Sequence, residues 1–203
     1  MPSQALCVSA MFIDTHSHIH GPEFDADRDE VLTRARSAGV ERCLAVGTDL
    51  AGSRSAIALA ARRPDVYATV GVHPHEASTI DADALKTLDE LAAAPRVVAY
   101  GEVGLDYYYE HSERSVQRTQ FAAQIALAER HHLPLVIHTR DAWDDTFALL
   151  DEQPHHRGVF HCFTGDLAQA ERALARRFFI SFSGIVTFPK SQALQEVARL
   201  IDF

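Results

Sequence analysis

The sequence predicts an α/β fold of the TIM type, a (β/α) barrel that lacks its eighth strand. Short apolar segments alternate with longer helical segments from one end of the chain to the other, and metal-ligand residue types follow several of the apolar segments. Apolar strands without polar alternation are typical of a parallel sheet covered by helices. A barrel brings the carboxyl ends of all such strands around one opening, whereas a doubly wound sheet gathers its ligands at one crevice. Because the ligand types are spread along the chain, a barrel is favoured.

Seven segments are predicted to be strands, because they are short, rich in Val, Ile and aromatic residues, and bounded by turn or helix signals. They are residues 11–15, 42–47, 67–72, 97–102, 134–138, 158–162 and 178–184. A closed barrel of this type has eight strands and about 250 residues. The chain has 203 residues and its last segment has helical spacing, so we expect the eighth strand to be missing.

Helices are predicted between and after the strands, where Ala, Leu, Arg and Glu dominate and apolar residues recur at helical spacing. They are residues 26–38, 51–63, 81–93, 113–132, 141–151, 166–176 and 191–201. Three polar residues fit the N-cap position, where a side-chain oxygen accepts a backbone N–H of the first turn. These N-caps are Asp81, Ser112 and Asp141.

The composition is that of a globular protein, with 47% hydrophobic and 23% charged residues. No apolar run approaches the roughly 20 residues of a membrane helix, and the first ten residues lack the features of a secretory signal. We therefore expect one domain over residues 11–203, preceded by a disordered extension over 1–10 or by a start at Met11. Three cysteines without CxxC spacing favour reduced thiols and a cytoplasmic location, with Cys162 as a core thiol.

Five residues of metal-binding type stand at the ends of predicted strands. They are His16, His18, Glu102, His138 and His161. Side chains alternate along a strand, so His16 and His18 are expected to point to the same side. Imidazoles together with a carboxylate suit a divalent transition metal held for hydrolysis. A set of buried, hydrogen-bonded core residues is the alternative, and it explains one such histidine better than four with a glutamate.

The segments DTHSHIH, GVHPH, GEVGLDYY, VIHTRDA and HCFTG occur in this order from about Met11 to the C-terminus. In order and spacing they resemble the TatD family of metal-dependent deoxyribonucleases, a branch of the amidohydrolase-type barrels. The resemblance implies two divalent ions (Mg, Mn or Zn), with Glu102 as the catalytic carboxylate that bridges them. His16, His18 and Glu102 would hold one ion, and Glu102, His138 and His161 the other.

The family also has a late aspartate, in a motif like ETDxPxL, that completes the first metal site and serves as general base. That motif does not occur in this sequence, and Asp202 lacks its neighbouring residues. The resemblance also suggests that His73 contacts substrate phosphate. Arg140 and Thr164 are predicted to bind phosphate or orient the ligands, with loop stabilisation as the alternative. Tyr107, Tyr108 and Tyr109 either stack on nucleobases or cap the rim of the barrel.

The predicted function is metal-dependent hydrolysis of phosphodiester bonds in DNA, on single strands or ends. A net charge of −9 argues against a broad phosphate-gripping surface, although bound cations can reverse the sign of a site. Hydrolysis of a small amide, lactone or phosphoester at the same metals is the second hypothesis, and an inactive truncated family member is the third. We expect no membrane association and no stable protein partner, but self-association through the open barrel edge.

Overall fold

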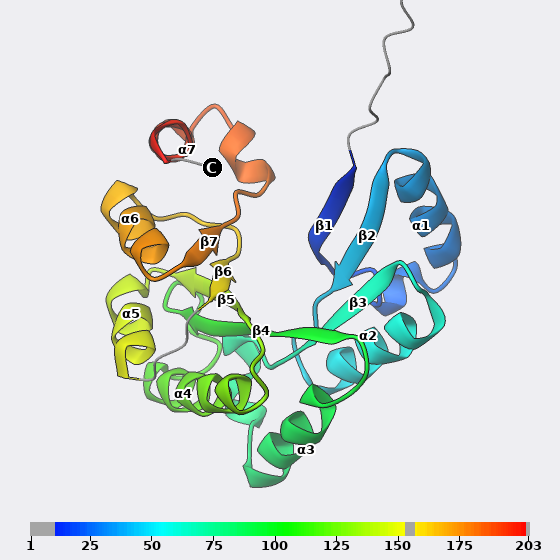
Figure 1. Cartoon of the computed structure of the whole chain (residues 1–203). Coiled ribbons are helices and arrows are strands. Elements are labelled where there is room, and N and C mark those ends of the chain that lie inside the picture. Colours follow the sequence, from blue (N-terminus) through cyan, green and yellow to red (C-terminus); the bar gives the residue numbers. More distant parts are fainter. Residues whose placement is uncertain (1–10, 153–156, 202–203) are drawn as a thin grey trace, which may run out of the picture.

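The computed structural model describes residues 11–152 and 157–201, which form a curled parallel sheet with helices on its outer side (Figure 1). The strands are β1 (Phe12–Ser17), β2 (Val40–Ala45), β3 (Val66–Val70), β4 (Val97–Asp106), β5 (Leu135–Arg140), β6 (Gly158–Phe160) and β7 (Phe178–Ile180). They pair in sequence order, each parallel to the next. The fold is thus a TIM-type α/β barrel that lacks one strand, as the sequence predicts.

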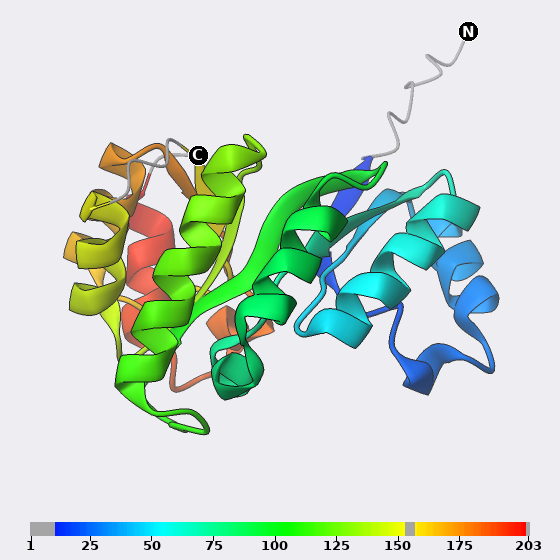
Figure 2. The same ribbon diagram turned by 90° about the horizontal axis from the view of Figure 1, so that it is seen from below.

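Each strand is followed by a helix. The helices are α1 (Arg28–Ser37), α2 (Leu50–Arg62), α3 (Ala82–Ala92), α4 (Arg114–Arg130), α5 (Trp143–Glu152), α6 (Leu167–Ala175) and α7 (Gln192–Leu200). Three short 3₁₀ turns lie in the loops: η1 (Pro22–Phe24), η2 (Pro74–Thr79) and η3 (Gly184–Thr187). Figure 2 shows the view from below, in which helices line the outer side of the sheet. No helix of the described residues is long and apolar enough to cross a membrane.

Several predicted boundaries need correction. Strand β4 runs on to Asp106, whereas β6 and β7 end at Phe160 and Ile180, earlier than predicted. Asp81 caps α3 by accepting the Ala84 N–H, as predicted. The other two predicted N-caps are wrong. Residues 1–10, the histidines at 155 and 156, and Asp202 lie outside the described residues.

Ser112 and Asp141 fail as caps for local reasons. The Ser112 hydroxyl is buried, where it donates to the His75 carbonyl (3.0 Å) and accepts the Ser78 N–H (3.1 Å). It therefore ties η2 to the start of α4, whose N-cap is Glu113. Asp141 has a φ of 53°, and α5 begins two residues later.

The core lies mainly between the sheet and its helices. Its largest fully buried side chains are aromatic, and they form the packed layer under α4, α5 and α6. Among them are Tyr100, Phe121, Phe147, Phe160 and Phe163. A second, smaller cluster joins α1 and α2 to β2 and β3. Both clusters hold the sheet in its curl, so that the carboxyl ends of the strands face one opening.

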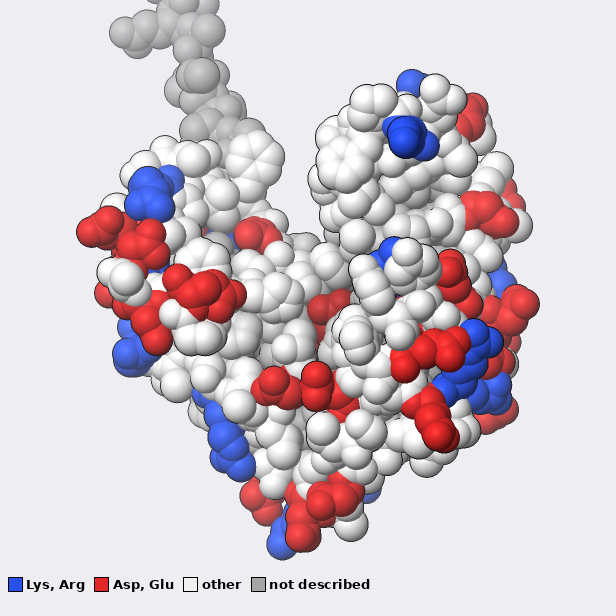
Figure 3. All heavy atoms as spheres, turned by 180° about the vertical axis from the view of Figure 1, so that it is seen from behind, with Lys and Arg blue, Asp and Glu red and all other residues white. Residues whose placement is uncertain are grey.

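The sheet has two free edges, because β1 and β7 have no hydrogen bonds with each other in the described part of the chain. Large apolar side chains are exposed on them, including Phe12 and Ile13 on β1 and Phe179 on β7. Seen from behind, the surface is deeply notched between the two sides of the molecule (Figure 3). Free, apolar strand edges favour pairing with another chain, and self-association here stays a prediction.

Candidate metal centre

The centre is built around Glu102 on β4, which is only 5% exposed. Its backbone N–H donates to the Gly47 carbonyl (2.8 Å), which fixes this part of β4 against the loop after β2. Its carboxylate faces three imidazoles. Oε2 lies 3.2 Å from Nε2 of His16, and Oε1 lies 3.1 Å from Nδ1 of His138 and 3.7 Å from Nε2 of His73. One buried carboxylate is thus shared by groups from three different strand ends.

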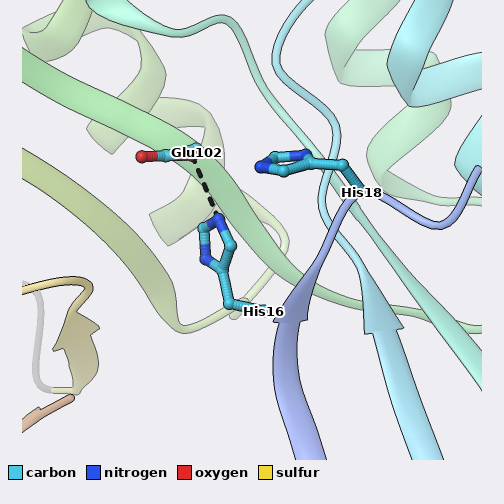
Figure 4. Close-up of side chains that lie close together, drawn as sticks. All are labelled: His16, His18 and Glu102. Carbon is cyan, nitrogen blue, oxygen red and sulfur yellow. Dashed lines mark ion pairs between the residues drawn. The ribbon is translucent and has the colours of Figure 1, made fainter. Parts of the chain in front are cut away.

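His16 and His18 approach Glu102 from the end of β1 (Figure 4). The His18 Nδ1–H donates to the Val46 carbonyl (3.1 Å), which orients the ring and leaves Nε2 for another partner. The two imidazoles meet edge to face, with ring centroids 5.1 Å apart. His16, His18 and Glu102 each offer one potential ligand atom, and these three atoms lie within 4.8 Å of one another. The structure therefore brings together the first predicted ligand set.

The second predicted set is brought together only in part. One potential ligand atom each from His73, Glu102 and His138 lies within 4.8 Å of the others. His161, which follows β6, instead stacks on His16, with ring centroids 3.3 Å apart. Its Nδ1 is buried without a hydrogen-bond partner. His161 thus lies beside His16 at the same centre. His73, which was predicted to bind phosphate, instead lies beside Glu102 and His138.

The centre combines an ionised Glu102 carboxylate with neutral rings at His73 and His161. Burial alone lowers the pKa of His138, but its hydrogen bonds to Glu102 and Asp106 outweigh burial and raise that pKa. Burial alone raises the pKa of Glu102, but hydrogen bonds from His138 and His16 outweigh it and hold that pKa well below its usual range. Burial lowers the pKa of His73 to about 3 and, with repulsion from His16, that of His161 to about 4. Neutral imidazoles offer lone pairs to a cation. The Nδ1 atoms of His16 and His161 are both buried without a hydrogen-bond partner. This donor set fits a divalent metal ion.

Asp106 belongs to the centre, although sequence reasoning did not select it. Its Oδ2 accepts from Nε2 of His138 (2.9 Å) and Nε2 of His75 (3.1 Å), and its Oδ1 accepts the N–H groups of Tyr108 and Tyr109. Burial raises its pKa, but the Tyr109 N–H and the two histidines lower it to about 2. Asp106 follows Glu102 by four residues on β4, so strand alternation was the signal that could have found it.

The remaining predicted contacts lie at the rim. Arg140 ends β5, and its guanidinium lies over the rings of Tyr108 and Tyr109. Thr164 is exposed in the loop after β6 and makes no hydrogen bond through its side chain to the described residues. Tyr107 has a structural role, because its hydroxyl donates to Asp145 (2.6 Å) and Arg114 packs on its ring. Of the three tyrosines, Tyr107 is thus packed at the rim, whereas Tyr108 and Tyr109 are exposed.

Outside the ligand set, the sequence interpretation of Cys162 needs correction. Cys162 has a φ of 47° beyond the end of β6 and is half-buried, with Sγ 2.9 Å from the Ser183 hydroxyl. It is therefore not the fully buried core thiol that alternation predicts. His20, in the loop after β1, is half-buried, and burial lowers its pKa to about 4.

A parallel barrel with imidazoles and carboxylates at the carboxyl ends of its strands is the architecture of metal-dependent hydrolases. The family model described as "TatD related DNase" matches residues 13–203, so the chain belongs to the TatD family. It is a metal-dependent hydrolase of that family.

Relatives of known name agree with this assignment. The chain is 37% identical over 193 residues to the uncharacterized metal-dependent hydrolase YabD of Bacillus subtilis, covering 94% of this chain and 76% of that protein. It is 41% identical over 175 residues to the 3'-5' ssDNA/RNA exonuclease TatD of Cronobacter turicensis, covering 85% and 66%. The crystal structure of YjjV, a TatD homologue from Escherichia coli, superposes with a TM-score of 0.88 at 31% identity, covering 94% and 75%.

Replacement of Asp106 by Asn is expected to weaken divalent metal binding by about 10- to 100-fold, because it removes the carboxylate that orients His138. Calorimetric titration of chelator-stripped protein with Mn²⁺ measures the effect. Asp144→Asn, at an exposed position on α5, is the matched control and should bind Mn²⁺ as the unaltered chain does. Equal Mn²⁺ affinity in the two variants would contradict the orienting role.

Proposed function

We propose that this chain hydrolyses phosphodiester bonds in DNA, on single strands or at ends, with a site that takes two divalent ions. The observation that carries the proposal is the sharing of Glu102 between imidazoles on both of its sides. A carboxylate has two oxygens and a charge, so it suits a bridging position between adjacent cations. The relative named as a 3'-5' ssDNA/RNA exonuclease supports a nucleic-acid substrate.

In the proposed arrangement His16, His18 and Glu102 hold one ion, and Glu102, His138 and His161 hold the other. The buried, unpartnered Nδ1 of His161 supports its role as a ligand. When bound, the ions supply Lewis acidity that lowers the pKa of a water and offsets charge on the phosphate. Mg, Mn and Zn all remain candidates, since such mixed sites accept several metals.

His73 suits contact with phosphate better than metal ligation. Its Nδ1 accepts the His75 N–H (3.2 Å), and burial keeps the ring neutral. A neutral imidazole that accepts at Nδ1 carries its proton on Nε2. This Nε2–H faces the Glu102 side of the centre and can donate to a phosphate oxygen. Arg140 and Thr164 lie on the same rim as further donors, and we propose phosphate contact for both.

A second candidate is hydrolysis of a small amide, lactone or phosphoester at the same metals. The net charge of −9 favours it, and the face in Figure 3 carries acidic side chains scattered among basic ones rather than a continuous basic surface. Fold and metal ligands do not separate the two chemistries. Relative rates on single-stranded DNA and on small esters or lactones therefore decide between them.

The test begins with chelator-stripped, folded protein titrated calorimetrically with Mn²⁺ and assayed on an end-labelled single-stranded oligonucleotide. We expect about two tightly bound ions per chain, consistent with a two-metal site, and hydrolysis that appears only with metal. One weak ion or none would mean that the five proposed ligands do not suffice. Cleavage that resists the chelator, or much faster hydrolysis of small lactones than of DNA, would refute the proposal.

A further inference from the structure

Two tyrosines are left exposed beside the metal centre. Tyr108 and Tyr109 lie two and three residues beyond the end of β4 and are 58% and 53% exposed. Their backbones are fixed, because both N–H groups donate to Oδ1 of the buried Asp106. The two rings meet edge to face, with centroids 4.8 Å apart. Exposed aromatic rings on a fixed backbone are a preorganised surface for stacking.

Arg140 adds a positive charge to these rings. Its guanidinium carbon lies 3.9 Å from the centroid of Tyr108 and 4.8 Å from that of Tyr109. No carboxylate of the described residues pairs with it, whereas the nearby Arg114 and Arg118 pair with Glu110 and Asp145. An unpaired cation in a chain of net charge −9 is available to an anionic ligand.

Contacts link this surface to the centre. The Tyr109 ring lies 5.6 Å from that of His75 and stacks on His111, with centroids 5.7 Å apart. His75 and His138 share Oδ2 of Asp106, and His138 contacts Glu102. The tyrosines are thus connected to the centre through His75 and Asp106, so a nucleic-acid strand with a phosphate at the centre would extend toward them.

We propose that Tyr108, Tyr109 and Arg140 form a nucleotide platform, on which bases of a single strand stack and a flanking phosphate meets the guanidinium. The inference rests on the proposed function, because it takes nucleic acid as the substrate. Bases inside a duplex are already stacked on each other, so the platform selects unpaired nucleotides. It also supplies local affinity that a chain of net negative charge does not gain from long-range attraction.

The test compares a short oligothymidylate with an abasic oligonucleotide of the same length, using kcat and KM of the Mn²⁺-loaded protein. The double variant Tyr108→Ala with Tyr109→Ala should raise KM for oligothymidylate by about 5- to 100-fold and change kcat far less. The preference for the base-bearing strand should collapse. The double variant with Phe at both positions keeps the ring faces and should restore that preference.

Tyr67→Ala is the matched control, since Tyr67 is also stacked by arginines but lies at the amino end of β3. It should keep the preference for oligothymidylate. If the unaltered protein hydrolyses DNA and the alanine variant keeps its preference, the platform is refuted while the proposed function stands.

If the unaltered protein hydrolyses neither strand, the proposed function fails and fluorescence anisotropy of labelled oligothymidylate tests the platform alone. Binding that is lost with Ala and kept with Phe supports the platform. Binding that is the same in all variants, or absent from all of them, overturns it.

Discussion

Glu102→Gln is expected to remove hydrolysis, with kcat lowered on the order of 10³-fold or more. The substitution keeps the size of the side chain and removes the charge that His16 and His138 face across 3.2 and 3.1 Å. Because one carboxylate belongs to both proposed ligand sets, a single amide should weaken both proposed metal sites together. If Glu102→Gln lost only one of two bound ions, Glu102 would belong to one metal site and would not bridge the two.

Two measurements separate this effect from misfolding. Calorimetric titration with Mn²⁺ gives the number of ions bound, and circular dichroism confirms that the variant is folded. Glu41→Gln is the matched control, because Glu41 is an exposed residue on β2 away from the centre. It should bind metal and hydrolyse substrate as the unaltered chain does. Activity of Glu102→Gln within tenfold of that control would refute a catalytic role for the carboxylate.

The order and type of the elements were predictable because the local and global signals agree. Every predicted strand and helix occurs, since apolar strands and Ala- and Leu-rich helices are what a parallel barrel requires. The errors lie at ends, where tertiary contacts decide. The sequence predicted Ser112 as an N-cap, but its hydroxyl forms hydrogen bonds with the backbone of η2 instead.

The centre was predictable in its residues and less so in its pairing. Strand ends placed His16, His18, Glu102 and His138 together, because barrel topology converges there. Which imidazole joins which set depends on loop geometry after the strands, and sequence alone did not predict the stacking of His161 on His16. The assignment of these residues as ligands, the cytoplasmic location and the disordered start stay predictions.

The motif GEVGLD is explained by how closely β4 and β5 approach. Gly104 pairs with His138 in the register of the two strands and has a φ of 142°, which favours glycine. A Cβ at this position would overlap the backbone carbonyl oxygen of His138. Glu102 lies two residues before this contact and Asp106 two residues after it, so the glycine lets β4 hold both carboxylates against the same histidine.

Gly104→Ala is therefore expected to lower the free energy of unfolding by about 3 kcal/mol. The alanine would have to adopt an unfavourable positive φ, and its Cβ would clash with the backbone of β5. Urea denaturation of the metal-free protein measures this loss, and Mn²⁺ titration should show weakened binding in parallel. Gly184→Ala is the control, since a Cβ there meets nothing within 4 Å and should change stability by less than about 0.5 kcal/mol. If Gly104→Ala unfolds at the same urea concentration as Gly184→Ala, the close approach of β4 and β5 is not what holds the two carboxylates around His138.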